Sequence, residues 1–252
     1  MSPVIGFHDL GKGSPVSITG VSEDQFRTHI SSLRERGACF RTLKYWLSHT
    51  LQPLDTLVTL DDAFSRQLEI ARDVLEPSKI PAVTFVIAGA VGRSASWDYA
   101  GTGRRHADWT ELKAWVAGGL EVASHAVSHR DLCRLSDLEL DFELTESRDR
   151  LEQELSVDVT GVAYPFGCSN RRVRAAARAA GYRIGFGTRP GAVVDDLMDV
   201  PRLLVSRLDT PLSVAGRMAP GLWGEIERGK QRVVSFCAGG TPLWQELRGD
   251  YR

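Results

Sequence analysis

The sequence predicts an α/β protein built around a parallel β-sheet. Short apolar segments alternate with longer segments whose apolar residues recur at helical spacing, and this alternation continues to about residue 186. No low-complexity linker or internal repeat interrupts it. The chain has 252 residues, of which 42% are hydrophobic, so it can bury a large core. We therefore expect a single domain over residues 1–252, with either a barrel or an open doubly wound sheet.

Six segments are predicted strands because they are short, apolar and bounded by turn-forming residues or helices. They cover residues 4–7, 56–60, 82–88, 120–124, 161–164 and 182–186. The predicted helices cover residues 22–36, 64–75, 108–116, 136–155 and 170–180. Ser22 with Gln25, and Asp108 with Glu111, form capping-box patterns at two of the helix starts. Helical and strand periodicity fades near Pro211, so residues 206–252 are expected to form a loop-rich C-terminal tail.

The charge balance argues against a nucleic-acid partner. The 31 Lys and Arg residues are offset by 32 Asp and Glu residues, which leaves no strong field to hold a phosphate backbone or an anionic membrane. No apolar run approaches the roughly 20 residues that span a bilayer, so we expect no transmembrane segment. The first residues lack the basic and apolar regions of a signal peptide, which predicts a cytoplasmic protein.

Polar residues follow four of the predicted strands at the ends where parallel-sheet enzymes place their chemistry. They are His8-Asp9, Asp61-Asp62, His125 with His129, and the turn Pro165-Phe166-Gly167. The two histidines are four residues apart, so a helical turn after the strand would bring both imidazoles to one face, where they can share a metal ion. Alternatively, one of them caps a helix or packs in the core.

Asp61 and Asp62 end an apolar strand, where burying two unpaired charges would be costly. One carboxylate can bind a metal while the other stays available as a base; alternatively, one of them caps the helix that starts near Phe64. Two histidines and one carboxylate form a hydrolytic metal site that leaves a position open for water. The pKa of a water on such a metal falls to about 7 in the best cases, and the second carboxylate can then take its proton.

Several motifs resemble, in order, those of the polysaccharide deacetylase family with the NodB homology domain (carbohydrate esterase family 4). The motifs are Thr59-Leu60-Asp61-Asp62, Ser124-His125-x-x-x-His129 and Ala163-Tyr164-Pro165-Phe166-Gly167, and the resemblance runs from about Val4 to Val205. It implies a distorted (β/α)7-type barrel. It also implies that Asp62, His125 and His129 bind one divalent metal ion, most simply Zn²⁺, with Co²⁺, Mn²⁺ or Ni²⁺ as alternatives. Asp61 would then be the general base, and the Phe166 N–H would help to hold the oxyanion.

The chain departs from the family pattern at three points. Ala63 replaces a glycine, which leads us to expect that the turn there does not need a positive φ. Ala163 stands where many members have an arginine that orients the base. We expect Arg202 to supply that charge, with an ordinary surface arginine as the alternative. No histidine follows His129, so the usual late general acid is absent.

The expected general acid is His8, because Phe7-His8-Asp9 resembles the opening of a family branch that carries its acid near the N-terminus. The alternative is a strand-end histidine with a structural role. His29 and His49 are expected to be surface or capping residues, and His106 to lie in a loop that could touch the substrate. Among the aromatic residues before the second motif, Trp97, Tyr99 and Trp109 could stack on a sugar ring, whereas Trp115 fits the core better.

Together these residues predict a metal-dependent hydrolase that removes an N-acyl group, most simply acetyl. The expected substrate is a small acylated amino sugar, a sugar conjugate or a short oligosaccharide. Two alternatives stay open, namely hydrolysis of a cyclic or other non-sugar amide on the same fold, and a carbohydrate-binding relative without activity. Retention of both Asp61 and Asp62 disfavours the last, because binding alone needs no free base. The sequence leaves the oligomeric state open.

Overall fold

The computed structural model describes residues 3–11, 18–95, 104–188 and 196–218. The main sheet has the order β10-β9-β8-β7-β6-β5-β1-β11, with β4 paired to the start of β5, and every pair is parallel. Its strands are β1 Val4–Phe7, β4 Cys39–Phe40, β5 Asp55–Leu60, β6 Ala82–Val86, β7 Glu121–Ser124, β8 Gly161–Ala163, β9 Ile184–Gly187, β10 Val200–Pro201 and β11 Leu203–Leu204. A separate parallel pair joins β2 (Asp9–Leu10) and β3 (Gly20–Val21).

One interrupted strand closes the sheet into a barrel. β10 pairs with β9 at one edge, β11 pairs with β1 at the other, and only Arg202 separates them in the chain. We call residues 200–204 the seam strand. Counted once, it joins β1 and β5–β9 to give seven strands around the barrel. The prediction of a distorted (β/α)7-type barrel is therefore confirmed, and the open doubly wound alternative is wrong.

The barrel interior is filled by a small hydrophobic cluster. Its strand residues are Val4, Leu57, Val83, Phe85, Ala123, Ala163, Ile184, Phe186 and Val200, at alternate positions of neighbouring strands. The short helix α2 (Leu43–Ser48), which the sequence did not predict, adds Leu43 and Trp46 to this cluster. The Glu121 carboxylate at the start of β7 accepts hydrogen bonds from the backbone N–H groups of Leu43 and Lys44, which fixes α2 across one end of the barrel.

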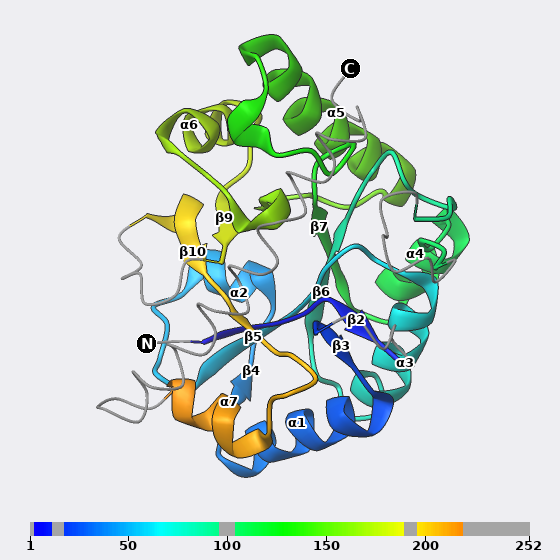
Figure 1. The fold of residues 1–252 in the computed structure, drawn as a ribbon, viewed down its shortest axis with the longest axis vertical. Helices are drawn as coiled ribbons and strands as arrows, with labels where there is room; N and C mark the ends of the chain where they lie inside the picture. Colours follow the sequence, from blue (N-terminus) through cyan, green and yellow to red (C-terminus); the bar gives the residue numbers. More distant parts are fainter. Residues whose placement is uncertain (1–2, 12–17, 96–103, 189–195, 219–252) are drawn as a thin grey trace.

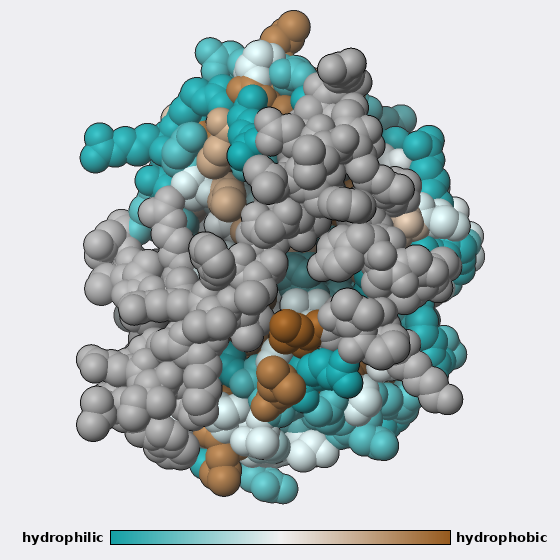
Figure 2. All heavy atoms as spheres, in the orientation of Figure 1, coloured by the Kyte–Doolittle hydropathy of each residue, from teal (hydrophilic) through white to brown (hydrophobic). Residues whose placement is uncertain are grey.

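Five longer helices surround the barrel (Figure 1). They are α1 Glu23–Glu35, α3 Ser65–Leu75, α4 Trp109–Ala117, α5 Asp137–Leu155 and α6 Arg171–Ala179. The capping boxes predicted at Ser22 and Asp108 are both formed, and Ser136 forms a third with Glu139. The strand residues that face outward pack against these helices in the larger hydrophobic cluster. Figure 2 shows mainly hydrophilic described residues along the rim of the molecule in this view.

The start of the predicted loop-rich tail contains a helix. Residues 211–218 form α7 (Pro211–Met218), a helix that the sequence did not predict. The Thr210 hydroxyl accepts a hydrogen bond from the Ser213 N–H, and Pro211 occupies the first turn, where its missing N–H costs nothing. Residues 219–252 of the predicted tail lie outside the described residues. No helix in the described ranges is long and apolar enough to cross a membrane.

Candidate metal-dependent active site

The structure brings all seven predicted site residues together at the C-terminal ends of the strands. His8 follows β1, the two aspartates follow β5, and His125 and His129 follow β7. Phe166 follows β8 within the short 3₁₀ helix η2 (Pro165–Gly167), and Arg202 lies in the middle of the seam strand. Sequence-distant residues meet here because the carboxyl ends of parallel strands share one rim of a barrel.

Asp62, His125 and His129 form the one cluster in the described chain that is suited to hold a metal ion. Their ligand atoms lie within 4.8 Å of one another, and Asp62 Oδ1 is 3.7 Å from the Nε2 atom of each histidine. Among the described residues, no group donates a hydrogen bond to this buried oxygen. The His125 Nδ1–H donates to the Ala163 carbonyl at 2.7 Å, which directs Nε2 toward Asp62. The residues therefore fit a divalent ion with open coordination positions.

Both histidines are held in the neutral form that binds metal. Burial lowers the pKa of His125 to about 4, with a further contribution from His129. Burial likewise lowers the pKa of His129 to about 3, assisted by the nearby His8. Because a metal ligand must present an unprotonated nitrogen, these imidazoles need no proton release near neutral pH before they bind an ion.

The loop that carries the histidines does not have the helical conformation expected from their spacing. No helix spans residues 125–129, which we call the His loop. Instead Ala126 (φ 64°) and His129 (φ 59°) both adopt the left-handed conformation. The two rings still meet, with centroids 4.8 Å apart. The predicted convergence is observed, but two left-handed residues bring it about instead of a helical turn.

Asp61 is completely buried and lies between two basic side chains. The two terminal nitrogens of the Arg202 guanidinium, Nη1 and Nη2, donate to its carboxylate, with Nη2 3.0 Å from Oδ2. His8 Nδ1 lies 3.3 Å from the same Oδ2. Burial alone would raise the pKa of Asp61, but the charges of Arg202 and then His8 outweigh it and hold that pKa well below its usual range. Asp61 is therefore an ionised carboxylate, and Arg202 is a buried partner rather than a surface residue.

The turn after β5 corrects the expectation for Ala63. Asp62 (φ 66°) and Ala63 (φ 49°) are both left-handed, so the turn does need positive φ and tolerates an alanine in place of the glycine. Neither aspartate caps the next helix, because Phe64 occupies the N-cap position of α3. His106 supports this strained turn, since its Nδ1–H donates to the Asp62 carbonyl at 2.7 Å and its ring stacks on Phe64.

His106 and His29 are both buried, contrary to the expectations for them. His106 is 2% exposed, so it is shielded from solvent and contacts the backbone of the proposed metal ligand Asp62. The sequence contained one signal that could have indicated an ordered His106. This residue lies two positions before the Asp108 N-cap of α4, which fixes the backbone there. His29 lies on the buried face of α1, near the Phe7 ring, with ring centroids 6.5 Å apart. His49 ends α2 and is exposed, as expected.

Phe166 provides a backbone donor beside the metal cluster. Its φ of 58° turns the chain after β8, and its ring packs edge-on against His129 with centroids 4.7 Å apart. None of the other described residues accepts a hydrogen bond from the Phe166 N–H. A donor left in this way, beside residues that can hold a metal ion, can stabilise negative charge that develops on a substrate oxygen.

Of the aromatic residues considered for sugar binding, Trp115 is fully buried, as expected, and its indole N–H donates to the Glu121 carbonyl. Trp109 is half-buried against the larger hydrophobic cluster between the barrel and its helices, which we call the outer cluster. The Arg150 guanidinium lies 5.6 Å from the Trp109 ring centroid. Trp97 and Tyr99 lie outside the described residues. His8 is the most accessible polar side chain at the Asp61 end of the site, with 31% of its side chain exposed.

Comparisons with known proteins agree with this geometry. The family described as "Polysaccharide deacetylase" matches residues 52–185. A poly-β-1,6-N-acetyl-D-glucosamine N-deacetylase of Staphylococcus aureus (strain MSSA476) is 27% identical over 201 residues, which are 74% of this chain and 68% of that protein.

Two solved structures share the fold. The Streptococcus pyogenes deacetylase PplD in complex with acetate superposes with a TM-score of 0.76 at 20% identity, covering 87% of this chain and 98% of that chain. IcaB from Ammonifex degensii superposes with a TM-score of 0.68 at 25% identity, covering 91% and 96%. The fold of these proteins thus extends over most of the chain, which is more than the family match covers.

Proposed function

This chain belongs to the polysaccharide deacetylase family, and we propose that it is a metal-dependent hydrolase that removes an N-acetyl group from an amino-sugar residue of an oligosaccharide or polysaccharide. The observation that carries the proposal is the pairing of a metal-ligand cluster with an ionised carboxylate. Asp62, His125 and His129 converge, and next to them Asp61 is held by Arg202. The name of the Staphylococcus aureus relative supports an N-acetylglucosamine polymer or a fragment of one as the substrate.

Asp62, His125 and His129 would hold a single divalent ion, most simply Zn²⁺, because two imidazoles and one carboxylate are its usual ligands at hydrolytic sites. Co²⁺, Mn²⁺ and Ni²⁺ suit the same ligands. When bound, the ion supplies Lewis-acid polarisation of the amide and increases the acidity of the attacking water.

The remaining residues divide the proton transfers between them. Asp61 accepts a proton from the water that attacks the amide carbon, and Arg202 keeps the carboxylate oriented for this. The Phe166 N–H donates to the carbonyl oxygen as its negative charge develops. His8 donates a proton to the sugar nitrogen as the C–N bond breaks, so that the amine leaves and acetate remains. His8 suits this role because it is partly exposed and lies beside Asp61.

The two alternative functions have less support. Hydrolysis of a cyclic amide rests on the fold alone, whereas the relative named above acts on an acetylated sugar polymer. A binding protein without activity would not require Asp61 to be buried with its charge kept by Arg202, at the cost of removing both groups from water.

The proposal is tested by acetate release from N-acetylglucosamine oligomers of one to six units, using protein loaded with Zn²⁺ or Co²⁺. We expect acetate release that a chelator abolishes and added metal restores.

Asp61→Asn should retain metal but lose turnover, His125→Ala should lose metal as well, and the exposed Asp73→Asn should behave as wild type. Equal turnover of Asp61→Asn and wild type would refute the mechanism. Hydrolysis of a cyclic imide, without acetate release from any sugar, would favour the alternative function of a cyclic-amide hydrolase.

A further inference from the structure

The His loop has a backbone that depends on its neighbours for its shape. Ala126 and His129 are left-handed, and an L side chain is strained there unless surrounding contacts fix the conformation. The segment that follows β6 holds one side of the loop. The Ala88 N–H donates to the Ala126 carbonyl at 3.0 Å, and the Gly89 N–H donates to the Val127 carbonyl at 2.9 Å. These bonds fix two carbonyls of the loop. The N–H groups of His125 and Ala126 donate to the Val86 carbonyl and the Ser124 hydroxyl, which leaves those of Val127 and Ser128 to another partner.

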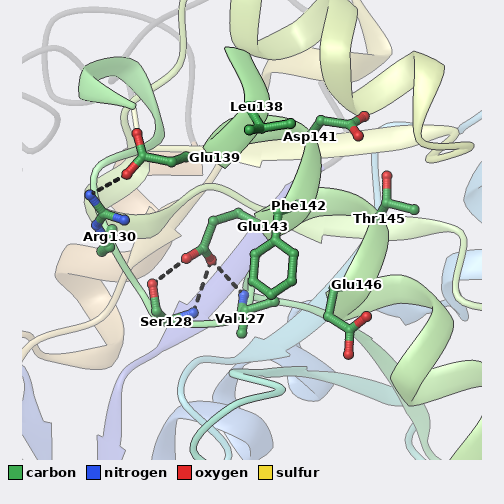
Figure 3. A pocket seen from close by; sticks show the side chains of 10 residues that line it. All are labelled: Val127, Ser128, Arg130, Leu138, Glu139, Asp141, Phe142, Glu143, Thr145 and Glu146. Carbon is green, nitrogen blue, oxygen red and sulfur yellow. Dashed lines mark hydrogen bonds and ion pairs between the residues drawn. The ribbon is translucent and has the colours of Figure 1, made fainter. Parts of the chain in front are cut away.

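Helix α5 provides that partner through Glu143. One carboxylate oxygen accepts hydrogen bonds from two successive N–H groups, of Val127 at 2.8 Å and Ser128 at 2.9 Å. The other oxygen accepts from the Ser128 hydroxyl. Figure 3 shows the carboxylate turned toward the loop, in contrast to the exposed Glu146 on the same helix. Glu143 is 3% exposed, and a buried carboxylate is tolerated only because these donors satisfy it.

We propose that Glu143 is the positioning residue that sets the separation and orientation of the His125 and His129 imidazoles. The proposal rests on the metal-binding function proposed above. The two peptide groups that Glu143 holds lie between the two histidines in the chain. His125 is already fixed by the Ala163 carbonyl, so the position of His129 relative to it depends on the intervening backbone. Metal affinity is sensitive to such support, since loss of a group that orients the ligands costs roughly 10–100-fold.

The attachment of α5 to the barrel does not depend on Glu143. Leu140, Leu144 and Leu151 of α5 are buried in the outer cluster. Ser147 also accepts a hydrogen bond from the Ser124 hydroxyl of β7 at 2.9 Å and contacts the Tyr182 hydroxyl at 3.0 Å. We therefore expect variants of Glu143 to fold, and their defect to appear in the metal site.

The test measures metal affinity directly, by competition for Zn²⁺ between the purified protein and a chromophoric chelator. Glu143→Ala is expected to weaken binding by about 10–100-fold. Glu143→Gln should stay within about 3-fold of wild type, because its amide oxygen can still accept from both N–H groups while its NH₂ donates to the Ser128 hydroxyl. Glu146→Gln, three residues further along α5, is the matched control and should not differ from wild type. With Co²⁺ in place of Zn²⁺, the visible absorption spectrum should change in Glu143→Ala only.

Glu143→Asp serves as a second variant if Glu143→Ala does not fold. It keeps the charge but withdraws the carboxylate by one methylene, so we expect about 10-fold weaker binding. A folded Glu143→Ala or Glu143→Asp protein with wild-type Zn²⁺ affinity and the wild-type Co²⁺ spectrum would overturn the inference about Glu143. The proposed function would still stand. A wild-type protein that binds no divalent ion would overturn the proposed function, and the inference with it.

Discussion

Asp61 and Asp62 are adjacent in the chain, yet their surroundings suit them to different tasks. Asp61 is buried against a guanidinium that donates through two nitrogens. Asp62 offers a buried oxygen to two neutral imidazoles, which cannot neutralise its charge. Two identical side chains can thus act as base and as metal ligand because their neighbours differ, which is how paired carboxylates are generally distinguished in hydrolases.

Arg202→Lys is expected to lower kcat by about 10–100-fold while metal content stays unchanged. A lysine keeps the charge but cannot make both hydrogen bonds to Asp61, and loss of one charged hydrogen bond is worth about 1.5–3 kcal/mol. Steady-state kinetics on an acetylated oligomer, with metal analysis, checks this. The exposed Arg207→Lys is the matched control. An Arg202→Lys enzyme with wild-type kcat would show that the orientation of Asp61 is not limiting.

His29 should make the free energy of unfolding depend on pH in acid. Burial, assisted by Arg217, lowers the pKa of His29 to about 4 in the folded state, against about 6.5 for a histidine in the unfolded chain. The unfolded chain therefore binds the proton first. The contribution of His29 to the free energy of unfolding is fully present well above pH 6.5. It decreases as the pH falls from about 6.5 toward 4 and then stays constant, with a maximum loss of about 3 kcal/mol.

Denaturant unfolding of wild type and His29→Gln between pH 8 and pH 4 isolates this contribution, because other groups titrate in both proteins. The difference in unfolding free energy between the two should shift in favour of His29→Gln as the pH falls. A difference that stays constant across the range would mean that His29 does not titrate between the folded and unfolded states.

At the level of elements, the sequence predicted the long helices and the longer strands well. Their caps and apolar spacing are local signals, as at Ser22 and Asp108, and the structure forms both caps. The two-residue strands β4, β10 and β11 are too short to carry a period, and they exist because a neighbouring strand is present to pair with them. Helix α2 is likewise fixed by the distant Glu121.

The site could be predicted as a set of residues but not as a geometry. The motifs predicted which residues would be the metal ligands and the base, and the search for an orienting charge and a general acid led to Arg202 and His8 as candidates; the structure brings these residues together. They did not contain the left-handed turns at Ala63 and Ala126, because these depend on contacts from other segments. The role of His106 was missed for the same reason, since its partner is the backbone of Asp62, 44 positions earlier.

The Gly89 contact predicts a clear effect on the His loop. A Cβ at Gly89 would lie 2.6 Å from the Val127 carbonyl oxygen, which is too close, so Gly89→Ala must push the loop outward. We expect a loss of about 1–3 kcal/mol of stability and weaker Zn²⁺ binding. Gly119→Ala is the control, because only its φ of +81° is unfavourable and no atom lies within 4 Å of the new methyl group. Gly89→Ala with unchanged Zn²⁺ affinity would contradict the expectation.

At the level of the whole molecule, the proposed metal links two segments, the turn after β5 and the His loop after β7, and should stabilise the fold. An ion that binds only the folded state, at about 1,000 times its Kd, adds about 4 kcal/mol and raises Tm by about 10 °C for a chain of this size. Thermal unfolding with Zn²⁺ and with a chelator measures the shift. His125→Ala should unfold at one temperature under both conditions, and a persistent shift in that variant would place the ion elsewhere.

The seam strand determines when the protein can become an enzyme. Residues 200–204 are the last part of the barrel to be synthesised, and they must pair with β1, which left the ribosome about two hundred residues earlier. Until then Asp62, His125 and His129 have already been synthesised, but Asp61 has no guanidinium beside it. A nascent or truncated chain that stops after β9 would thus carry the proposed metal ligands without the guanidinium that orients the proposed base. Closure of the barrel by the seam strand is therefore also the moment at which hydrolysis can begin.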